Sequence, residues 1–277
     1  MKKKTNREPR GPRLKAAIRR RPAVFTVYLV LRLIVVGTLV SSIVRGEYES
    51  AFICLLVLVL YMLPFFIKQN FGIELPSTLE IIILLFIFAA EILGELDCYF
   101  ITFPYWDTML HTTTGFLCAA TGFALIDILN RNSRIKFTLS PVYVALVAFC
   151  FSMTVGVLWE FFEFGMDRLL HWDMQKDTVV HSITSVMLDP TNKNIPVTVS
   201  GIESVVINGQ DLGLGGYLDI GLYDTMEDLF VNFIGAVVFS VIGYFYIKRR
   251  GKGKIAKAFI PTITDTADTP ETPEKSE

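Results

Sequence analysis

Six long apolar windows constrain the fold of this chain more than any other feature of its sequence. A helix that spans a bilayer needs about 20 mostly apolar residues. The windows run from about residue 23 to 44, 50 to 67, 76 to 96, 104 to 129, 141 to 167 and 228 to 247. Pro76, Pro104 and Pro141 stand where a helix should begin, which suits the fixed φ and the missing N–H of proline. We therefore predict an all-α membrane protein, a six-helix transmembrane bundle.

The composition supports this class and excludes others. Hydrophobic residues make up 52% of the 277 residues and charged residues 19%, with a mean hydropathy of +0.48. A disordered chain would be poor in hydrophobic residues and rich in charge. The net charge of −1 shows no basic excess for binding nucleic acid. We expect membrane lipids as partners and no nucleic acid, and the sequence indicates no particular protein partner.

The distribution of basic residues predicts the orientation of the bundle. Lys and Arg concentrate in the cytoplasmic loops of membrane proteins. With six spans, 21 of the 26 Lys and Arg residues fall on the side that holds both termini. The opposite side holds only Arg45, Arg168, Lys176 and Lys193. We therefore predict an N-in/C-in topology.

The chain outside the spans contains two basic ends and one sizeable loop. The predicted segments are a basic cytoplasmic arm (1–22), a membrane domain (23–247, with an outer loop at about 168–227) and a cytoplasmic tail (248–277). The Asn208-Gly209 pair between alternating apolar runs is typical of a hairpin turn, so we expect a small β-hairpin in this extracytoplasmic loop. The Thr- and Pro-rich composition after Ile260 predicts that the tail, basic at first, becomes disordered.

Ionisable and polar residues within the last three spans form the candidate functional site, because a charged group is costly in a bilayer and is by default a functional hypothesis. The candidates are Asp107, His111, Glu160, Glu163, Asp224, Asp228 and Asn232. Within each helix they stand three or four positions apart and share one face. Gly115, Gly156 and Gly235 continue these faces, and small residues let helices approach closely. The three helices alternate in direction, yet all the candidates fall in outer turns, at one level.

This residue set predicts a divalent-cation site. Several carboxylates in a place of low dielectric must take up protons or bind a cation. Oxygen ligands suit Mg or Mn, and imidazole adds Zn and Fe. The predicted metal ligands are Asp107, His111, Glu160, Glu163 and Asp228. Asp224 and Asn232 are expected to support these ligands or to replace one of them.

Structural roles compete with this interpretation. Asp107 and Asp224 stand near helix starts, where Asp is a favourable cap. His111 and the buried acids would otherwise form a hydrogen-bonded network without a ligand. Arg32, within the first span, is expected to pair with Glu80 or Glu91.

Three ordered motifs resemble those of a known family, the YjdF-like inner-membrane proteins. The motifs are Tyr105-Trp106-Asp107-x-x-x-His111 followed by Gly115, Gly156-x-x-Trp159-Glu160-x-x-Glu163, and Asp224-x-x-x-Asp228-x-x-x-Asn232-x-x-Gly235-Ala236. The family consists of prokaryotic multi-pass proteins, so the resemblance implies a bacterial plasma membrane. It has no established activity, and the resemblance therefore supplies no reaction.

Three classes of function follow. An enzyme would carry out metal-assisted hydrolysis or transfer on a lipid or envelope precursor, with Glu160 or Glu163 as the general base. An ion- or proton-coupled transporter would use the carboxylates as relays, although the off-centre cluster and the lack of a repeat count against it. A non-catalytic membrane scaffold would dock a partner on its outer hairpin.

Overall fold

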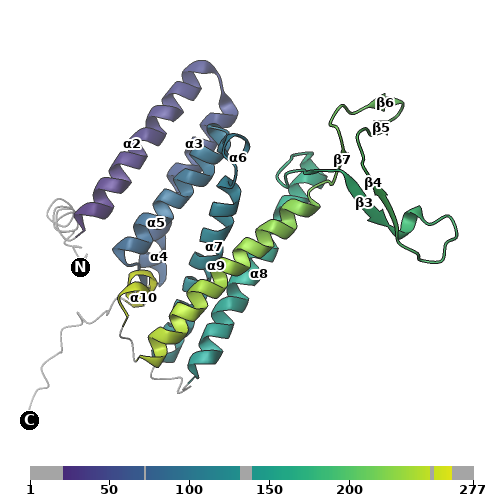
Figure 1. The fold of residues 1–277 in the computed structure, drawn as a ribbon. Helices are drawn as coiled ribbons and strands as arrows, with labels where there is room; N and C mark the ends of the chain where they lie inside the picture. Colours follow the sequence, from purple (N-terminus) through teal and green to yellow (C-terminus); the bar gives the residue numbers. More distant parts are fainter. Residues whose placement is uncertain (1–20, 72, 132–138, 250–252, 264–277) are drawn as a thin grey trace, which may run out of the picture.

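Helices form most of the protein (Figure 1). The computed structural model describes residues 21–71, 73–131, 139–249 and 253–263. The α-helices are α2 (Pro22–Arg45), α3 (Tyr48–Leu60), α4 (Leu63–Phe71), α5 (Ser77–Ile87), α6 (Tyr99–Thr102), α7 (Trp106–Arg131), α8 (Pro141–Leu170), α9 (Leu222–Lys248) and α10 (Lys254–Phe259). A π-helix, η1 (Phe88–Leu96), continues α5, and a short 3-10 helix, η2 (Val186–Leu188), lies in the long loop.

Five stretches of the described chain are long and apolar enough to cross a membrane. They are Pro22–Arg45, Tyr48–Asn70, Trp106–Ile126, Pro141–Leu170 and Leu222–Lys248. The remaining predicted span, 76–96, is divided between α5 and the π-helix η1, so its regular α-helical part has only 11 residues. The membrane-spanning, mostly helical character of the chain is clear, while the count of six and the N-in/C-in topology stay predictions.

Helix α8 is the longest element and shows how local sequence sets its ends. The Ser140 hydroxyl accepts a hydrogen bond from the Tyr143 N–H at 3.2 Å, and Pro141 occupies the first turn. The helix ends at His171, whose backbone is left-handed with φ 57°. Its 30 residues extend about 45 Å at 1.5 Å per residue, more than the hydrocarbon thickness of about 30 Å. The helix must tilt or project from the bilayer.

The connection between α8 and α9 holds three antiparallel strand pairs. They are β2 (Val179–Val180) with β7 (Tyr217–Leu218), β3 (Ser182–Ser185) with β4 (Val197–Ser200), and β5 (Val206–Ile207) with β6 (Gln210–Asp211). The hairpin predicted at Asn208-Gly209 is confirmed, because these residues join β5 to β6 with φ of 54° and 83°. Positive φ at both positions is what a type I′ turn requires. The connection covers 171–221, since both flanking helices extend further than predicted.

The end of the described chain returns to the helices. Helix α10 contacts both α5 and α9, and β8 (Thr262–Ile263) pairs with β1 (Ile73–Glu74). Ile260 is buried. The disorder predicted after Ile260 is therefore wrong for 261–263, because the strand partner is far away in sequence and composition cannot reveal it. The rest of the predicted disordered tail (264–277), and residues 1–20 of the basic arm, lie outside the described residues.

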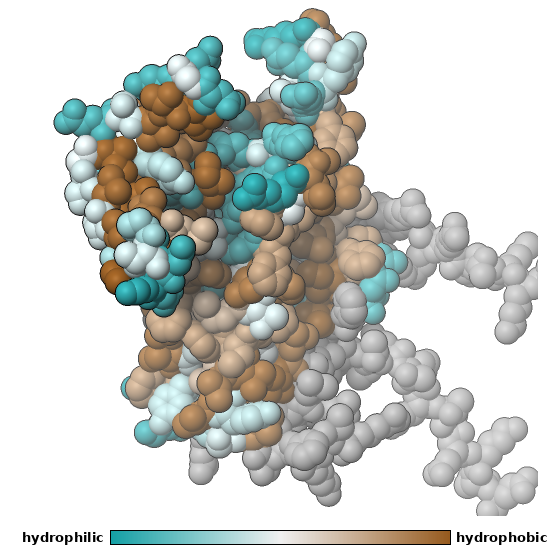
Figure 2. All heavy atoms as spheres, turned by 90° about the vertical axis from the view of Figure 1, so that its right-hand side faces the viewer, coloured by the Kyte–Doolittle hydropathy of each residue, from teal (hydrophilic) through white to brown (hydrophobic). Residues whose placement is uncertain are grey.

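Two groups of helices make up the fold, each with its own core. The amino-terminal group consists of α2, α3, α5 and η1, and the carboxy-terminal group of α7, α8 and α9 (Figure 1). The first core consists of Leu31, Val35, Cys54, Val57, Tyr61, Leu84, Ile87 and Ile92. The second core consists of Ala119, Ala120, Phe123, Ile126, Val144, Ala148, Ala236, Phe239 and Ile260. Figure 2 shows hydrophobic residues over much of the lower part of one face and hydrophilic residues gathered toward its upper end.

Glycines let α7 and α9 approach as closely as two backbones can. A Cβ atom on Gly115 would lie 2.2 Å from the Asn232 carbonyl oxygen, and one on Gly235 would lie 2.1 Å from the Thr112 carbonyl oxygen. Any larger residue would force the helices apart. The close contact predicted from the small residues is therefore present, and it fixes the register of the two helices that carry most of the candidate site.

Arg21, rather than Arg32, pairs with Glu80. The Arg21 guanidinium lies 3.2 Å from Glu80 Oε2 and 2.9 Å from Glu74 Oε1. Arg32 donates a hydrogen bond to the Tyr28 hydroxyl on the same helix and lies over its ring. Arg21 immediately precedes α2 and lies beside the start of α5, so its guanidinium is within ion-pair distance of Glu80.

Candidate metal centre

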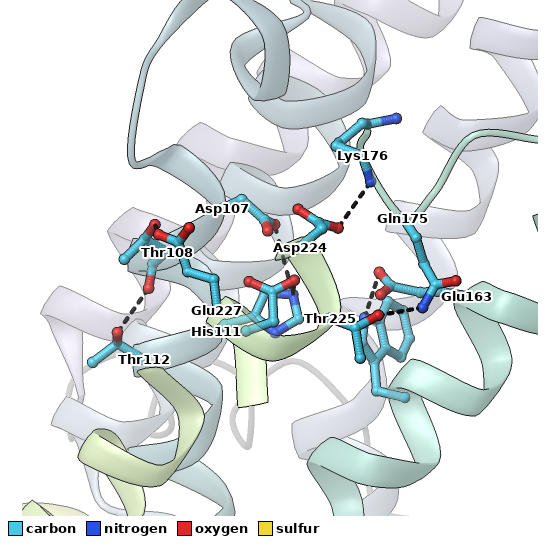
Figure 3. A network of polar contacts seen from close by, with 12 residues as sticks. Asp107, Thr108, His111, Thr112, Glu163, Gln175, Lys176, Asp224, Thr225 and Glu227 are labelled. Atoms are coloured by element: carbon cyan, nitrogen blue, oxygen red, sulfur yellow. Dashed lines mark hydrogen bonds and ion pairs between the residues drawn. The ribbon is translucent and has the colours of Figure 1, made fainter. Parts of the chain in front are cut away.

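The first part of the site lies between α7 and α9. Asp107 is in the first turn of α7 and His111 follows one turn later, so both side chains share a face. His111 Nε2 lies 3.6 Å from Asp107 Oδ1 and 3.6 Å from Asp228 Oδ2 of α9. One possible ligand atom from each of these three residues falls within 4.8 Å of the other two. Figure 3 shows Asp107 and His111 beside Asp224 at the beginning of α9.

The second part lies between α8 and α9 and contains only carboxyl groups. Glu160, Glu163 and Asp228 again place ligand atoms within 4.8 Å of one another. Their exposed fractions are 4%, 7% and 3%, so all three are buried. Trp159 Nε1 donates a hydrogen bond to Glu163 Oε1 at 2.8 Å. Asp228 belongs to both groups and connects them.

Two oxygen atoms of this second group are without hydrogen-bond partners among the described residues. They are Glu160 Oε2 and Glu163 Oε2, both fully covered by the protein. A buried acceptor that makes no hydrogen bond costs about 1–3 kcal/mol. Such atoms persist in a fold when something else satisfies them, such as an ion or a water.

The remaining two predicted site residues, Asp224 and Asn232, make contacts outside the two groups. Asp224 Oδ2 accepts the Lys176 backbone N–H at 2.9 Å and so ties the long loop to α9 (Figure 3). Asn232 is 1% exposed and its Nδ2 lies 3.6 Å from Met153 Sδ. A Cβ on Gly156 would come within 2.7 Å of the same amide. Asn232 therefore fills the contact between α8 and α9 and belongs to neither ligand group of the described chain.

Sequence reasoning did not identify Gln175 and Thr225, which join the long loop to α9 beside the site. Asp167 accepts the backbone N–H groups of Met174 at 2.6 Å and Gln175 at 2.9 Å, which turns the chain back over α8. Gln175 Nε2 then donates a hydrogen bond to Thr225 Oγ1 at 2.5 Å, which ties the loop to the start of α9 (Figure 3). Thr225 stands three residues before Asp228, so helical spacing could have revealed it. Nothing local in the sequence reveals Gln175.

Among the described residues, no Lys or Arg forms an ion pair with the four carboxyl groups of the site. Lys176 turns its ammonium toward Asp173, 3.7 Å from Oδ2, and away from the cluster. Four carboxyl groups and one imidazole thus meet in a partly buried space. Mutual repulsion and desolvation both disfavour four free carboxylates here, so protons or a cation must offset them.

The fold and the site define an integral, multi-pass membrane protein with a buried acidic centre at one end of its last three long helices. A family model described as a predicted membrane protein, DUF2238, matches residues 26–249, which include every residue of the site. The chain belongs to the DUF2238 family. Searches of curated proteins and of solved structures gave no match.

Proposed function

We propose that this protein binds a divalent cation between α7, α8 and α9, in a bacterial plasma membrane. One observation carries the proposal: the partnerless, buried oxygens of Glu160 and Glu163 belong to a group whose ligand atoms lie within 4.8 Å of one another. A cation would satisfy both oxygens and offset the repulsion between the carboxylates. The ligand types suit Zn, Mn, Fe or Mg.

The reaction that fits such a centre best is metal-assisted hydrolysis or transfer on a lipid or envelope precursor. An open apolar pocket of about 280 Å³ beside α7 and α9 would suit a substrate with a lipid chain. Its lining consists of Ile82, Thr112, Thr113, Phe116, Leu117, Gly235, Val238 and Phe259. Its lining residue Thr112 directly follows His111 on α7. Glu160 or Glu163 would accept the proton of the attacking water and return it to the leaving group.

Two other functions remain as alternatives. An ion- or proton-coupled transporter would use the same carboxyl groups as a relay, and a scaffold would use the strands of the long loop for docking. The resemblance of the three motifs to the YjdF-like proteins supports the bacterial membrane location and favours none of these functions. Ion flux in liposomes would identify the transporter.

Elemental analysis of the full chain in mild detergent tests the cation directly. We expect stoichiometric metal in the wild type and its loss in a His111→Ala, Glu160→Gln double variant. Glu203→Gln, which changes an exposed carboxyl group in the long loop, is the matched control and should keep the metal. If the wild type binds none of Zn, Mn, Fe or Mg when each is supplied, the proposal is wrong.

A further inference from the structure

We infer that the site holds two cations rather than one, with the Asp228 carboxylate between them as a bridging ligand. This inference rests on the proposed cation-binding function and adds a second metal position to it. It comes from the way the five ligands divide between the helices.

The ligand atoms form two sets that share a single residue. Asp107 and His111 of α7 join Asp228 in one set, and Glu160 and Glu163 of α8 join Asp228 in the other. Ligands of one ion at bond lengths of about 2.0–2.2 Å lie within roughly 4.4 Å of each other. Because the five side chains separate into two sets within 4.8 Å, each set matches the coordination sphere of its own ion.

The position of Asp228 suits a bridge. Asp228 is in the second turn of α9, which packs against α7 on one side and α8 on the other. Its Oδ2 faces His111 Nε2 at 3.6 Å, which places that oxygen in the first set. A carboxylate has a second oxygen that can bind another ion, so one Asp is sufficient to connect both positions.

Charge balance also favours a second cation over a single one. Asp107, Asp228, Glu160 and Glu163 together carry four negative charges when ionised, and His111 is a neutral ligand. One divalent cation would leave two negative charges in a place where three of the four carboxyl groups are buried. Two divalent cations neutralise the set completely, which is the arrangement that costs least in a medium of low dielectric.

The chemical character of the two positions differs. The set on α7 includes an imidazole nitrogen, whereas the set on α8 offers only oxygen. Nitrogen ligands favour Zn or Fe, and oxygen ligands favour Mg or Mn. Mn²⁺ is accepted by both kinds of site and is paramagnetic, which makes it the suitable probe.

The experiment is Mn²⁺ titration of the full-length wild type in detergent, with metal analysis and electron paramagnetic resonance. We expect two Mn²⁺ per chain and the spectrum of an exchange-coupled pair, since ions that share a carboxylate lie about 3.5–4 Å apart. One Mn²⁺ per chain with the hyperfine pattern of an isolated ion overturns the inference and leaves the proposed function standing. No bound Mn²⁺, Zn²⁺, Fe²⁺ or Mg²⁺ overturns both.

Three variants assign the positions. His111→Gln should lose one ion and the coupling while the second ion stays, and a Glu160→Gln, Glu163→Gln variant should lose the other ion. Asp228→Asn should abolish the coupling, because the amide oxygen binds only one of the two ions well. Glu203→Gln, the exposed control, should keep both ions. Loss of both ions together in every site variant, with thermal unfolding unchanged, would contradict two separate positions.

Discussion

The amino-terminal helices α2, α3 and α5 pack through branched and aromatic side chains, whereas α7 and α9 pack backbone against backbone. Leu31, Val57 and Leu84 represent the first kind of contact. Gly115 and Gly235 create the second. Close backbone packing brings ionisable groups of neighbouring helices within ligand distance, which spacing by large side chains would prevent. The contrast teaches that the close packing of α7 and α9 is what brings the polar residues of the carboxy-terminal group together, beside an apolar core.

The buried polar residues show the same difference. Among the described spans, the carboxy-terminal group buries three acids, an amide and two serines: Glu160, Glu163, Asp228, Asn232, Ser152 and Ser240. In the amino-terminal group, Ser42 is the only buried polar residue of the described helices. Ser152 of α8 donates a hydrogen bond to the Gly115 carbonyl oxygen of α7 at 2.7 Å, so α8 is held against α7 at the same glycine that lets α9 approach. We expect changes in the two groups to have very different consequences.

The largest effect on stability is expected from Gly235→Ala. Its methyl group would lie 2.1 Å from the Thr112 carbonyl oxygen, and because backbone cannot move aside the cost should reach or exceed the upper end of the about 1–3 kcal/mol typical of overpacking. Gly37 of α2 is the matched control, because a Cβ there meets nothing within 4 Å. Gly37→Ala should stabilise by up to about 1 kcal/mol through helix propensity. Unfolding in detergent measures the change in stability of both variants. Equal changes would contradict the difference in packing between the two helix groups.

Removal of the cation is expected to have the next largest effect. A ligand present at about 100 times its Kd adds roughly 2.7 kcal/mol of stability, so a chelator should lower the wild-type unfolding temperature. The Glu160→Gln, Glu163→Gln variant should respond much less, because it has lost one set of ligands. Calorimetry with and without chelator tests this. If the chelator leaves the wild-type unfolding temperature unchanged, the carboxy-terminal cluster is a structural network that holds no cation.

A smaller effect is expected at Arg21 in the amino-terminal group. Its ion pairs with Glu74 and Glu80 are partly exposed, and pairs of this kind contribute about 1 kcal/mol or less. Arg21→Ala should therefore destabilise slightly, and less at high salt because the charges are screened. Metal content should not change. A loss of metal in this variant would show that the two groups depend on each other more than their separate cores indicate.

The smallest effect on the whole molecule is expected at Asp189 in the long loop. The Thr191 hydroxyl and the backbone N–H groups of Thr191, Ile195 and Lys193 donate to this carboxylate and hold its pKa down to about 2. The unfolded pKa is about 3.9, so the stabilisation is present above that pH and is lost as the pH falls through about 2.

Asp189→Ala should therefore lower the protection of the 189–195 amides against hydrogen exchange at neutral pH, and the loss of protection that the wild type shows below about pH 4, measured relative to the intrinsic exchange rate, should be absent in the variant. Hydrogen-exchange mass spectrometry follows this segment and the helices in one measurement. The helices serve as the internal control and should be unaffected. Faster exchange across α8 and α9 would mean that the loop supports the site more strongly than its contacts indicate.

Much of the site follows from helical geometry and was predictable. The spacing of Asp107 and His111, and of Glu160 and Glu163, determines a shared face on each helix. Alternating helix directions then bring these faces to one level. The shared role of Asp228 was beyond sequence reasoning, because it depends on how α9 is rotated between two neighbours. That rotation comes from the backbone contacts at Gly115 and Gly235.

Contacts between distant segments were the least predictable part of the fold. Arg32 was expected to pair with Glu80 or Glu91. In the structure, Arg21 lies next to the start of α5 and forms the ion pair with Glu80. The order of residues 261–263 depends on β1, which lies about 190 residues earlier in the sequence. Composition and periodicity describe one segment at a time and carry no information on such pairings.

The pairing of β1 with β8 has a consequence for the order in which the protein is assembled. Ile73 meets Ile263, so this contact cannot form until the chain has been synthesised to that point. The amino-terminal helices must wait in the bilayer while the later spans are inserted, and the two groups can be joined here only afterwards. Biosynthesis interrupted before Lys254 would leave both helix groups in the membrane without the α10 and β8 connection between them. This particular connection between the groups is thus made late, after insertion.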